Sequence, residues 1–348
     1  MQLPSPSPGS GAARPLAGLP KAHLHLHFTG AMRHATLVEL AEAAGVALPR
    51  QLREDWPPEL SGADERGWFR FQRLYDVARS VLRTEGDVRR LVDETVADEA
   101  TEGSRWLEIQ VDPSGYTTRF DGLVSFTELV LDAVGAASAA HGVGVGVVIA
   151  ANRTRHEQDS RTLARLAAQF AGGGVVGFGL SNDERRAPAA NFAHAFDIAR
   201  KAGLLLTPHG GELLGPDSVR ECLEVLRADR LGHGVHAADD PDVLAAVVDR
   251  QVGLELCPAS NVSLGVYPTA ADVPLRRLFD AGALIALGAD DPLLFGHRLV
   301  AQYAIARHDH DFTDVELADL ARRSFAASTA PPDVRAAADA DIDAWLAA

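Results

Sequence analysis

The chain repeats one local pattern along most of its length: a short apolar stretch, often β-branched, that follows a segment of helical periodicity. Only the first such stretch lacks a preceding helical segment, and the eight stretches are residues 22–28, 106–111, 143–150, 174–180, 203–209, 230–235, 252–258 and 283–291. Short apolar runs of this kind are typical of parallel strands buried on both faces. Eight β/α units favour a closed barrel over an open doubly wound sheet. We therefore predict an α/β fold, a single (β/α)8 TIM-type barrel.

The segments around these units predict the domain limits. Residues 34–100 are too long for one β/α crossover, so we expect extra helices after the first strand, and residues 313–348 read as helices that close the barrel. Residues 1–17 are rich in Pro, Ser and Gly and lack the pattern of a signal peptide, so a disordered lead-in is expected there. The barrel domain is then expected to span residues 18–348.

Charge and cysteine content restrict the class of partner. The net charge of -15 disfavours nucleic acid and anionic membranes as partners. An anionic small molecule stays compatible with it, because one cation inside a pocket outweighs a distant, screened surface. Two cysteines make no disulfide framework, so a cytoplasmic location is expected. The apolar residues 133–151 approach membrane-spanning length, but they contain Ser138 and His141 and fit a helix that runs into a buried strand.

The stretch LPKAHLHLHFTGAMR, residues 19–33, holds histidines at alternate positions, which places their side chains on one face of a strand. In a barrel of this type, functional groups lie at the C-terminal ends of the strands. Histidine or aspartate ends four of the predicted strands: His25 and His27 the first, His209 the fifth, His233 the sixth, and Asp290 with Asp291 the eighth. Three imidazoles and one carboxylate suit Zn²⁺ and leave a position for water. An isolated pair of buried histidines would instead be structural, and His23, one step further back, is expected to support the site or the core.

Three further positions have a functional and a structural interpretation. Glu212 in HGGE can face a substrate held over a metal, or it can be a loop carboxylate near a helix start. His233 lies between two glycines that allow close backbone approach, although a turn histidine would fit the same pattern. In ADDP, Asp290 can bind metal while Asp291 points into a pocket, or the pair can cap a helix.

The motifs LPKAHLHLHFTG, SNDE, HGGE, LGHG, CPASN and DDPLLF occur in the order and spacing of the adenosine deaminase family, which the chain resembles over about residues 19–330. That family belongs to the amidohydrolase superfamily of mononuclear zinc barrels. The motifs of the unrelated cytidine-deaminase type are absent from the sequence. The resemblance implies one Zn²⁺ per chain and a role for each matching residue. The implied roles are zinc ligation by His25, His27, His209 and Asp290, protonation of purine N1 by Glu212, action as base by His233 or Asp290, contact with N7 by Asp291, and contact of the Asn182 backbone with N3.

Two departures from the family pattern concern the substrate. Thr29 stands where the family usually has an acidic residue that contacts the ribose 5′-hydroxyl, and SNDE replaces the usual G-D-E at Asn182. Arg33 could clamp a carboxylate there, or it could be a solvated arginine at a helix start. Thr29 with Arg33 resembles the branch that acts on 6-aminodeoxyfutalosine, a 5′-extended adenosine bearing a benzoate, on the futalosine route to menaquinone.

The expected function is therefore zinc-dependent hydrolytic deamination of a 6-aminopurine nucleoside, with 6-aminodeoxyfutalosine as the preferred substrate. Adenosine and other 5′-modified adenosines, such as methylthioadenosine, are the alternatives. A non-catalytic nucleoside-binding barrel is a remote alternative, since Glu212, His233 and all four implied ligands are present. We expect a small-molecule partner and neither nucleic acid nor membrane.

Overall fold

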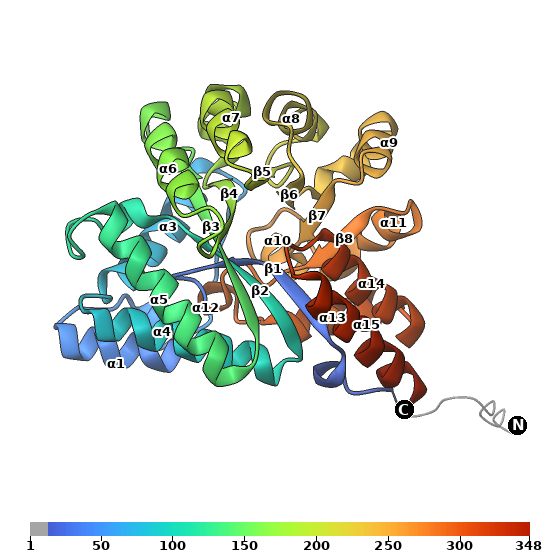
Figure 1. Ribbon diagram of the computed structural model, residues 1–348, viewed down its shortest axis with the longest axis horizontal. Helices are drawn as coiled ribbons and strands as arrows, with labels where there is room; N and C mark the ends of the chain where they lie inside the picture. The colour runs from blue at the N-terminus through green and yellow to red at the C-terminus, as the bar shows by residue number, and fades with distance from the viewer. Residues whose placement is uncertain (1–12) are drawn as a thin grey trace, which may run out of the picture.

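The computed structural model describes residues 13–348, and eight parallel strands form its centre (Figure 1). Each strand pairs with the next in chain order. The strands are β1 (Lys21–His27), β2 (Ser104–Val111), β3 (Gly144–Asn152), β4 (Val175–Ser181), β5 (Leu205–Gly210), β6 (Arg230–His233), β7 (Gly253–Leu256) and β8 (Leu284–Leu287). A bridge between Leu26 and Asp290 links the chain after β8 to β1, with Asp290 N donating to His25 O at 3.0 Å. The predicted eight-stranded barrel is confirmed.

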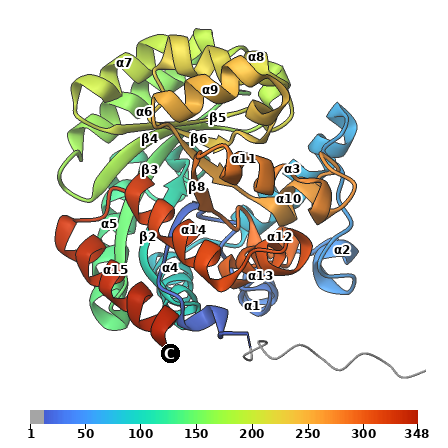
Figure 2. The same cartoon turned by 90° about the vertical axis from the view of Figure 1, so that its right-hand side faces the viewer.

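Helices surround the strands (Figures 1 and 2). Four helices lie between β1 and β2, namely α1 (His34–Ala44), α2 (Arg50–Arg53), α3 (Glu65–Ser80) and α4 (Glu85–Thr101). The later ones are α5 (Leu123–His141), α6 (Glu157–Gln169), α7 (Ala193–Lys201), α8 (Pro216–Glu221), α9 (Pro241–Asp249), α10 (Pro258–Ser263), α11 (Leu275–Asp280), α12 (Pro292–Phe295), α13 (Leu299–Asp309), α14 (Asp314–Ala327) and α15 (Pro332–Ala347). Extra helices after the first strand and at the C-terminus are thus both present, as predicted.

The apolar stretch at residues 133–151 forms the end of α5 and most of β3. Gly142 ends α5 in the left-handed conformation with φ 72°, which is the usual way for a glycine to stop a helix. By length and composition alone, α5 is long and apolar enough to cross a membrane. One face of it, including Phe126, Val130 and Ala133, is buried, and the helix packs against α4 and β3. This packing is that of a helix on the outside of a barrel.

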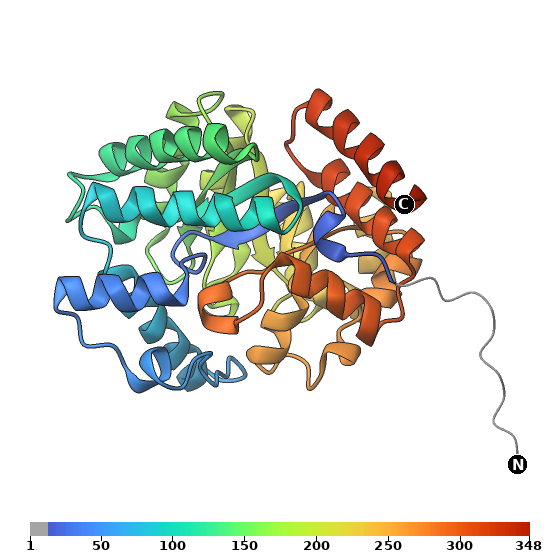
Figure 3. The same ribbon diagram turned by 90° about the horizontal axis from the view of Figure 1, so that it is seen from below.

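The ordered barrel begins earlier than residue 18. Residues Leu16–Gly18 form a 3-10 helix, Arg14 donates to Leu346 O at 2.7 Å, and Trp345 donates to Pro15 O at 3.0 Å. These contacts attach the start of the described chain to α15, near the C-terminus (Figure 3). The predicted disordered lead-in is therefore wrong for residues 14–17, because Leu16 is buried in the core. The rest of that prediction, on residues 1–12, lies outside the described residues.

Two buried polar side chains hold β1 in place. His23 accepts a hydrogen bond from Ala289 N at 3.0 Å through Nε2, so its Nδ1 carries the proton and donates to Glu99 at 2.9 Å. His23 therefore joins β1, the chain directly after β8, and α4, which fits the supporting role expected for it. Lys21 donates to Leu16 O at 2.6 Å and to Leu19 O at 2.5 Å.

Burial lowers the pKa of Lys21 to about 7 from the ordinary 10.5. The nearby charges of Glu102 and Glu99 oppose that shift, and the charge of Arg105 adds to it. Burial thus favours the uncharged amine of Lys21 from about neutral pH upward in the folded protein.

Candidate active site

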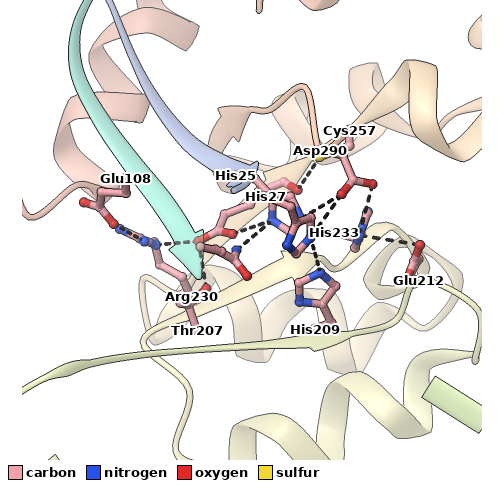
Figure 4. A network of polar contacts seen from close by, with 12 residues as sticks. His25, His27, Glu108, Thr207, His209, Glu212, Arg230, His233, Cys257 and Asp290 are labelled. Carbon is pink, nitrogen blue, oxygen red and sulfur yellow. Dashed lines mark hydrogen bonds and ion pairs between the residues drawn. The ribbon is translucent and has the colours of Figure 1, made fainter. Parts of the chain in front are cut away.

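Four side chains converge at the C-terminal ends of β1, β5 and β8 (Figure 4). His27 Nε2 lies 3.3 Å from His209 Nε2 and 3.2 Å from Asp290 Oδ1, and His25 Nε2 lies 3.5 Å from the same oxygen. The three histidines form a group able to hold a metal ion, and their ligand atoms lie within 4.8 Å of one another. The structure thus brings together all four residues predicted to bind a metal, called here the metal group: His25, His27, His209 and Asp290.

The local electrostatics fit a cation between these side chains. Burial opposes a charge on His25, but contacts with Asp290 and Glu255 outweigh it and raise the pKa of His25 to about 10. Burial lowers the pKa of His209 well below its usual value, which leaves a neutral imidazole. Within residues 13–348, His25 Nε2 is buried without a hydrogen-bond partner. An unpaired nitrogen beside a carboxylate and two further imidazoles is the kind of donor set that a divalent transition metal takes.

A row of buried ion pairs, called here the buried charge chain, lies behind the metal group and consists of Glu108, Arg230, Glu255 and His25. His25 Nδ1 donates to Glu255 Oε2 at 2.7 Å, and Arg230 Nε donates to Glu255 Oε1, also at 2.7 Å. Arg230 Nη2 donates to Glu108, so one guanidinium joins two carboxylates (Figure 4). The bond to Glu255 fixes the ring of His25 with Nε2 directed at the metal group.

Backbone conformation also shapes the site. His233 and Asp290 both have φ 61°, and Asn182 has φ 79°, a left-handed region that residues other than glycine rarely adopt. A Cβ added at Gly232 would lie 2.8 Å from His209 Nδ1 and 2.9 Å from His25 Cε1. The close backbone approach expected around the LGHG histidine therefore occurs, at two imidazoles of the metal group.

Glu212 and His233 face the metal group from one side. His233 Nε2 lies 3.6 Å from Glu212 Oε1 and 3.9 Å from Asp290 Oδ2. Burial, followed by the charges of Asp290 and Glu184, raises the pKa of Glu212 well above its usual range. Burial lowers the pKa of His233 to about 3, despite the charge of Asp290. Burial thus favours the protonated carboxyl of Glu212, which can donate, and the neutral imidazole of His233, which can accept a proton.

Glu184 holds the loop that carries Glu212. Its buried carboxylate accepts hydrogen bonds from the backbone N–H groups of residues 211–214, at 2.6 to 3.1 Å, and from the Ser218 hydroxyl. One carboxylate therefore fixes four consecutive residues of the HGGE loop. Glu184 belongs to the SNDE motif, but the sequence analysis gave it no role.

An inner cavity of about 60 Å³ opens onto these groups. It is lined by His27, Trp68, Phe71, Gln72, Tyr75, Arg79, Gln110, Asp112, Ala150, Asn152, Ser181, Asn182, His209, Glu212, His233, Leu264, Asp290 and Asp291. Asp291 is buried, and burial followed by the charge of Asp290 raises its pKa well above the usual range. A protonated carboxyl can donate a hydrogen bond to a ring nitrogen.

Asn182 lies at the mouth of this cavity, and its side chain is already engaged. It accepts from Trp68 Nε1 at 3.1 Å and donates to Gln72 Oε1 at 3.0 Å, which ties the loop after β4 to α3. The backbone of Asn182 is therefore the part left to contact a substrate, as the resemblance implied.

The two residues predicted to select the substrate lie outside the inner cavity. Thr29 is buried, and its hydroxyl is hydrogen-bonded to that of Tyr116. Arg33 makes a two-point contact with Asp98, with Nη2 at 2.6 Å and Nε at 3.1 Å, and it lines a separate surface cavity. The predicted clamp at Arg33 does not fit this placement, because the start of α1 turns the side chain toward α4.

The functional residues that the sequence analysis missed are of two kinds. Glu108 and Glu255 are each an acidic residue between two apolar neighbours in a buried stretch of strand, and a charge in such a place needs a buried partner. That signal was available, although it does not name the partner. Tyr75 and Arg79 lie on α3, whose position over the barrel mouth has no local sequence signal.

Comparison with known proteins identifies the family. The adenosine deaminase family model matches residues 20–345. A protein of Streptomyces virginiae provisionally named adenosine/adenine deaminase is 61% identical over 96% of this chain and 98% of its own length. An adenine deaminase of Sinorhizobium medicae is 36% identical, over 90% of this chain and 94% of its own. The crystal structure of an adenine deaminase from Arthrobacter aurescens superposes with a TM-score of 0.87 at 29% identity, covering 95% of this chain and all of that one. The chain belongs to the adenosine deaminase family.

Proposed function

We propose that this protein is a zinc-dependent hydrolytic deaminase of 6-aminopurines, which replaces the 6-amino group by oxygen and releases ammonia. The observation that carries the proposal is that Glu212, His233 and Asp291 line one cavity together with three of the metal-group side chains, and that the fourth, His25, lies 3.5 Å from Asp290 behind them. A proton donor, a base and a metal group within one small cavity match the needs of hydrolysis at an amidine carbon.

His25, His27, His209 and Asp290 would hold the zinc. Ser260 donates to Asp290 Oδ2 at 2.6 Å and so fixes that carboxylate. When bound, zinc supplies a water whose pKa is lowered to about 7. Imidazole nitrogens and carboxylate oxygens are ordinary zinc ligands, so this set would hold zinc without a thiolate.

The remaining residues of the site would act on the purine. Glu212 donates its proton to N1, which relieves the charge that builds on the ring as C6 is attacked. Asp291 donates to N7, and the backbone at Asn182 meets N3. His233 and Asp290 lie 3.9 Å apart, and either can accept the proton of the attacking water and return it to the leaving ammonia.

As substrate we propose 6-aminodeoxyfutalosine, converted to futalosine for menaquinone synthesis in the cytoplasm. Thr29 supports this, because its hydroxyl bonds Tyr116 and offers no carboxylate to a free 5′-hydroxyl. Both cysteines are free and buried, which suits a reducing compartment. Adenosine and methylthioadenosine remain the nucleoside alternatives.

A second candidate substrate is adenine itself. It is favoured by the adenine deaminases among the relatives at 36% identity and by the small inner cavity. One water needs about 10–15 Å³ of such space, so about 60 Å³ corresponds to about four to six waters and is closer to the size of a base than to that of a nucleoside.

The test is a steady-state comparison of 6-aminodeoxyfutalosine, adenosine, methylthioadenosine and adenine with the zinc-loaded protein, followed at the purine absorbance. We expect 6-aminodeoxyfutalosine to have the highest kcat/KM. A tenfold preference for adenosine or adenine would overturn the substrate assignment and leave the deaminase assignment intact. Ammonia release from none of the four, with product nucleosides still bound, would indicate a non-catalytic barrel instead.

A further inference from the structure

Arg79 lies where the inner cavity meets a second, wider one. It is on the last turn of α3 and lines both the inner cavity of about 60 Å³ and an outer cavity of about 660 Å³. Trp68, Gln72, Asn152 and Asn182 also line both, so the two cavities adjoin. Any group of a substrate that leaves the inner cavity on this side passes Arg79.

The Arg79 side chain is held in place, but part of its hydrogen-bonding capacity is free. The guanidinium packs over the rings of Tyr75 and Tyr116, at 5.1 and 5.9 Å from their centroids. A Cβ added at Gly115 would lie 2.9 Å from Arg79 Nε, so the backbone there is in close contact with it. Nη1 pairs with the exposed Asp76 at 3.0 Å, while Nε is buried and has no partner among the described residues. Because Nε is covered by the Gly115 backbone and Nη1 is engaged by Asp76, Nη2 is the nitrogen left to donate to an anion, in one charged contact.

The outer cavity is basic although the chain as a whole carries a net charge of -15. Its charged lining comprises five arginines (Arg66, Arg70, Arg79, Arg155 and Arg186) and three acidic residues (Glu65, Asp76 and Asp183). Asp183 is paired with Arg185, which is not part of the lining, and Glu65 lies 3.6 Å from Arg186. Within residues 13–348, Arg66, Arg70 and Arg155 make no ion pair. Local positive charge of this kind favours an anion even on an acidic protein.

The orientation of the purine places a substituent in this region. If C6 faces the metal group, with N1 at Glu212 and N7 at Asp291, the glycosidic nitrogen lies on the opposite side of the ring system. A ribose and its 5′ substituent then extend away from the metal group. The inner cavity has too little room for them, so they reach the boundary where Arg79 lies.

We propose that Arg79 binds an anionic group carried on the 5′ side of a 6-aminopurine nucleoside, and that it selects such substrates over neutral ones. This inference rests on the proposed function and assigns the cation that Arg33 does not supply. A carboxylate on an aryl substituent and a 5′-phosphate share the required chemistry. The exposed Phe69 and the indole of Trp68 in the outer cavity offer an aryl group an apolar surface, so the carboxylate is the expected form.

The experiment compares Arg79→Gln, Arg79→Lys and Arg33→Gln with the parent protein on three substrates: 6-aminodeoxyfutalosine, adenosine 5′-monophosphate and adenosine. One charged hydrogen-bonding contact corresponds to a loss of about 10- to 100-fold. We expect Arg79→Gln to lower kcat/KM for the carboxylate substrate by that factor, mainly by raising KM. The same variant should change kcat/KM for adenosine by less than about threefold. Arg79→Lys should recover part of the loss. Arg33→Gln should leave kcat/KM unchanged for all three substrates, because Arg33 is paired with Asp98 away from both cavities.

Calorimetric binding of futalosine, inosine 5′-monophosphate and inosine to the same variants gives a readout that does not depend on turnover. A drop in affinity for the two anionic products, with the affinity for inosine unchanged, supports the inference. Whichever of futalosine and inosine 5′-monophosphate binds the parent protein more tightly shows whether the site prefers a carboxylate or a phosphate. Equal losses for anionic and neutral ligands would make Arg79 a structural residue and overturn it. A parent protein that deaminates 6-aminopurines but shows no preference for any anionic form would also overturn it, whereas the proposed function would stand. Failure to deaminate these three and adenine as well would count against the proposed function, and the calorimetric comparison would still decide whether Arg79 binds the anionic group.

Discussion

Replacing Glu255 by Gln removes one charge from the buried charge chain and keeps the volume of the side chain. Glu255 is completely buried and accepts three hydrogen bonds, from His25 and Arg230 at 2.7 Å and from Thr207 at 2.8 Å. Burial disfavours its charge, but the charge of Arg230 and the bond from His25 outweigh burial and lower the pKa of Glu255 to about 2. The Glu255 carboxylate is therefore an anion at neutral pH.

Two effects of Glu255→Gln follow from this geometry. The amide of the new Gln places an N–H group opposite a donor, and Arg230 keeps only the carboxylate of Glu108 as an ion-pair partner. Breaking a buried ion pair in this way costs about 3–5 kcal/mol of folding free energy. The bond that orients His25 loses its charge, and loss of such a partner typically lowers metal affinity by about 10- to 100-fold. The second effect is the specific one, because many buried substitutions destabilise a protein.

The matched control is Glu108→Gln, at the other end of the same guanidinium. Glu108 accepts from Arg230 Nη2, from Trp106 Nε1 at 3.0 Å and from Thr329, but it does not contact His25. Both variants are measured by urea unfolding and by competition for zinc with a chromophoric chelator. We expect similar losses of stability, with a loss of zinc affinity only for Glu255→Gln. Equal zinc affinities in the two variants would refute the role of Glu255 in orienting His25. If Glu255→Gln does not fold, Thr207→Val removes one donor to the same carboxylate at about 1 kcal/mol and serves as the milder variant.

Three other outcomes are expected. Glu212→Gln should reduce kcat about 10²–10⁴-fold and leave the zinc content unchanged, because the residue supplies a proton and no ligand; loss of zinc measured by atomic absorption would contradict this. Lys21→Met should remove a pH dependence of stability, because a folded pKa of about 7 means that the unfolded chain binds more protons than the folded one between pH 7 and 10.5. The free energy of unfolding of the parent protein should therefore rise by about 3 kcal/mol from pH 7 to pH 10 relative to that of the variant. Plots of the free energy of unfolding against pH that run parallel for the two proteins would contradict this. Gly232→Ala should weaken zinc binding without blocking folding, since the added Cβ displaces two imidazoles, and an unchanged zinc dissociation constant would show that the rings can shift freely.

The fold and the metal group could be predicted because both follow from local patterns. A buried parallel strand has a recognisable composition, and the barrel brings all its C-terminal strand ends to one face. His209 and Asp290, which lie 81 residues apart in the chain, therefore had to meet once eight strands were counted. The assignment of His23 to a supporting position was also available, since it is one strand step behind His25.

The substrate side could not be predicted in the same way. Arg33 was chosen because it lies close in sequence to Thr29, but the chain turns into α1 between them and Asp98 takes up its charge. Arg79 is 50 residues from Thr29 and comes near the cavity only because α3 lies across the barrel mouth. Proximity in the sequence is informative at a strand end and uninformative across an inserted group of helices, because tertiary packing alone decides where those helices lie.

The groups that carry out the reaction and the residue proposed to select the substrate lie on different elements of the fold. The metal group and the proton donor are carried by strand ends and by a loop that Glu184 fixes through four backbone bonds. The residue proposed to select the substituent, Arg79, lies instead on α3, and the bonds that join α3 to Asn182 come from Trp68 and Gln72 and not from Arg79. Substitutions at Arg79 should therefore act on substrate choice independently of substitutions at Glu212, and their effects on the free energy of the transition state should add, because the two side chains share no hydrogen-bond partner in the described chain.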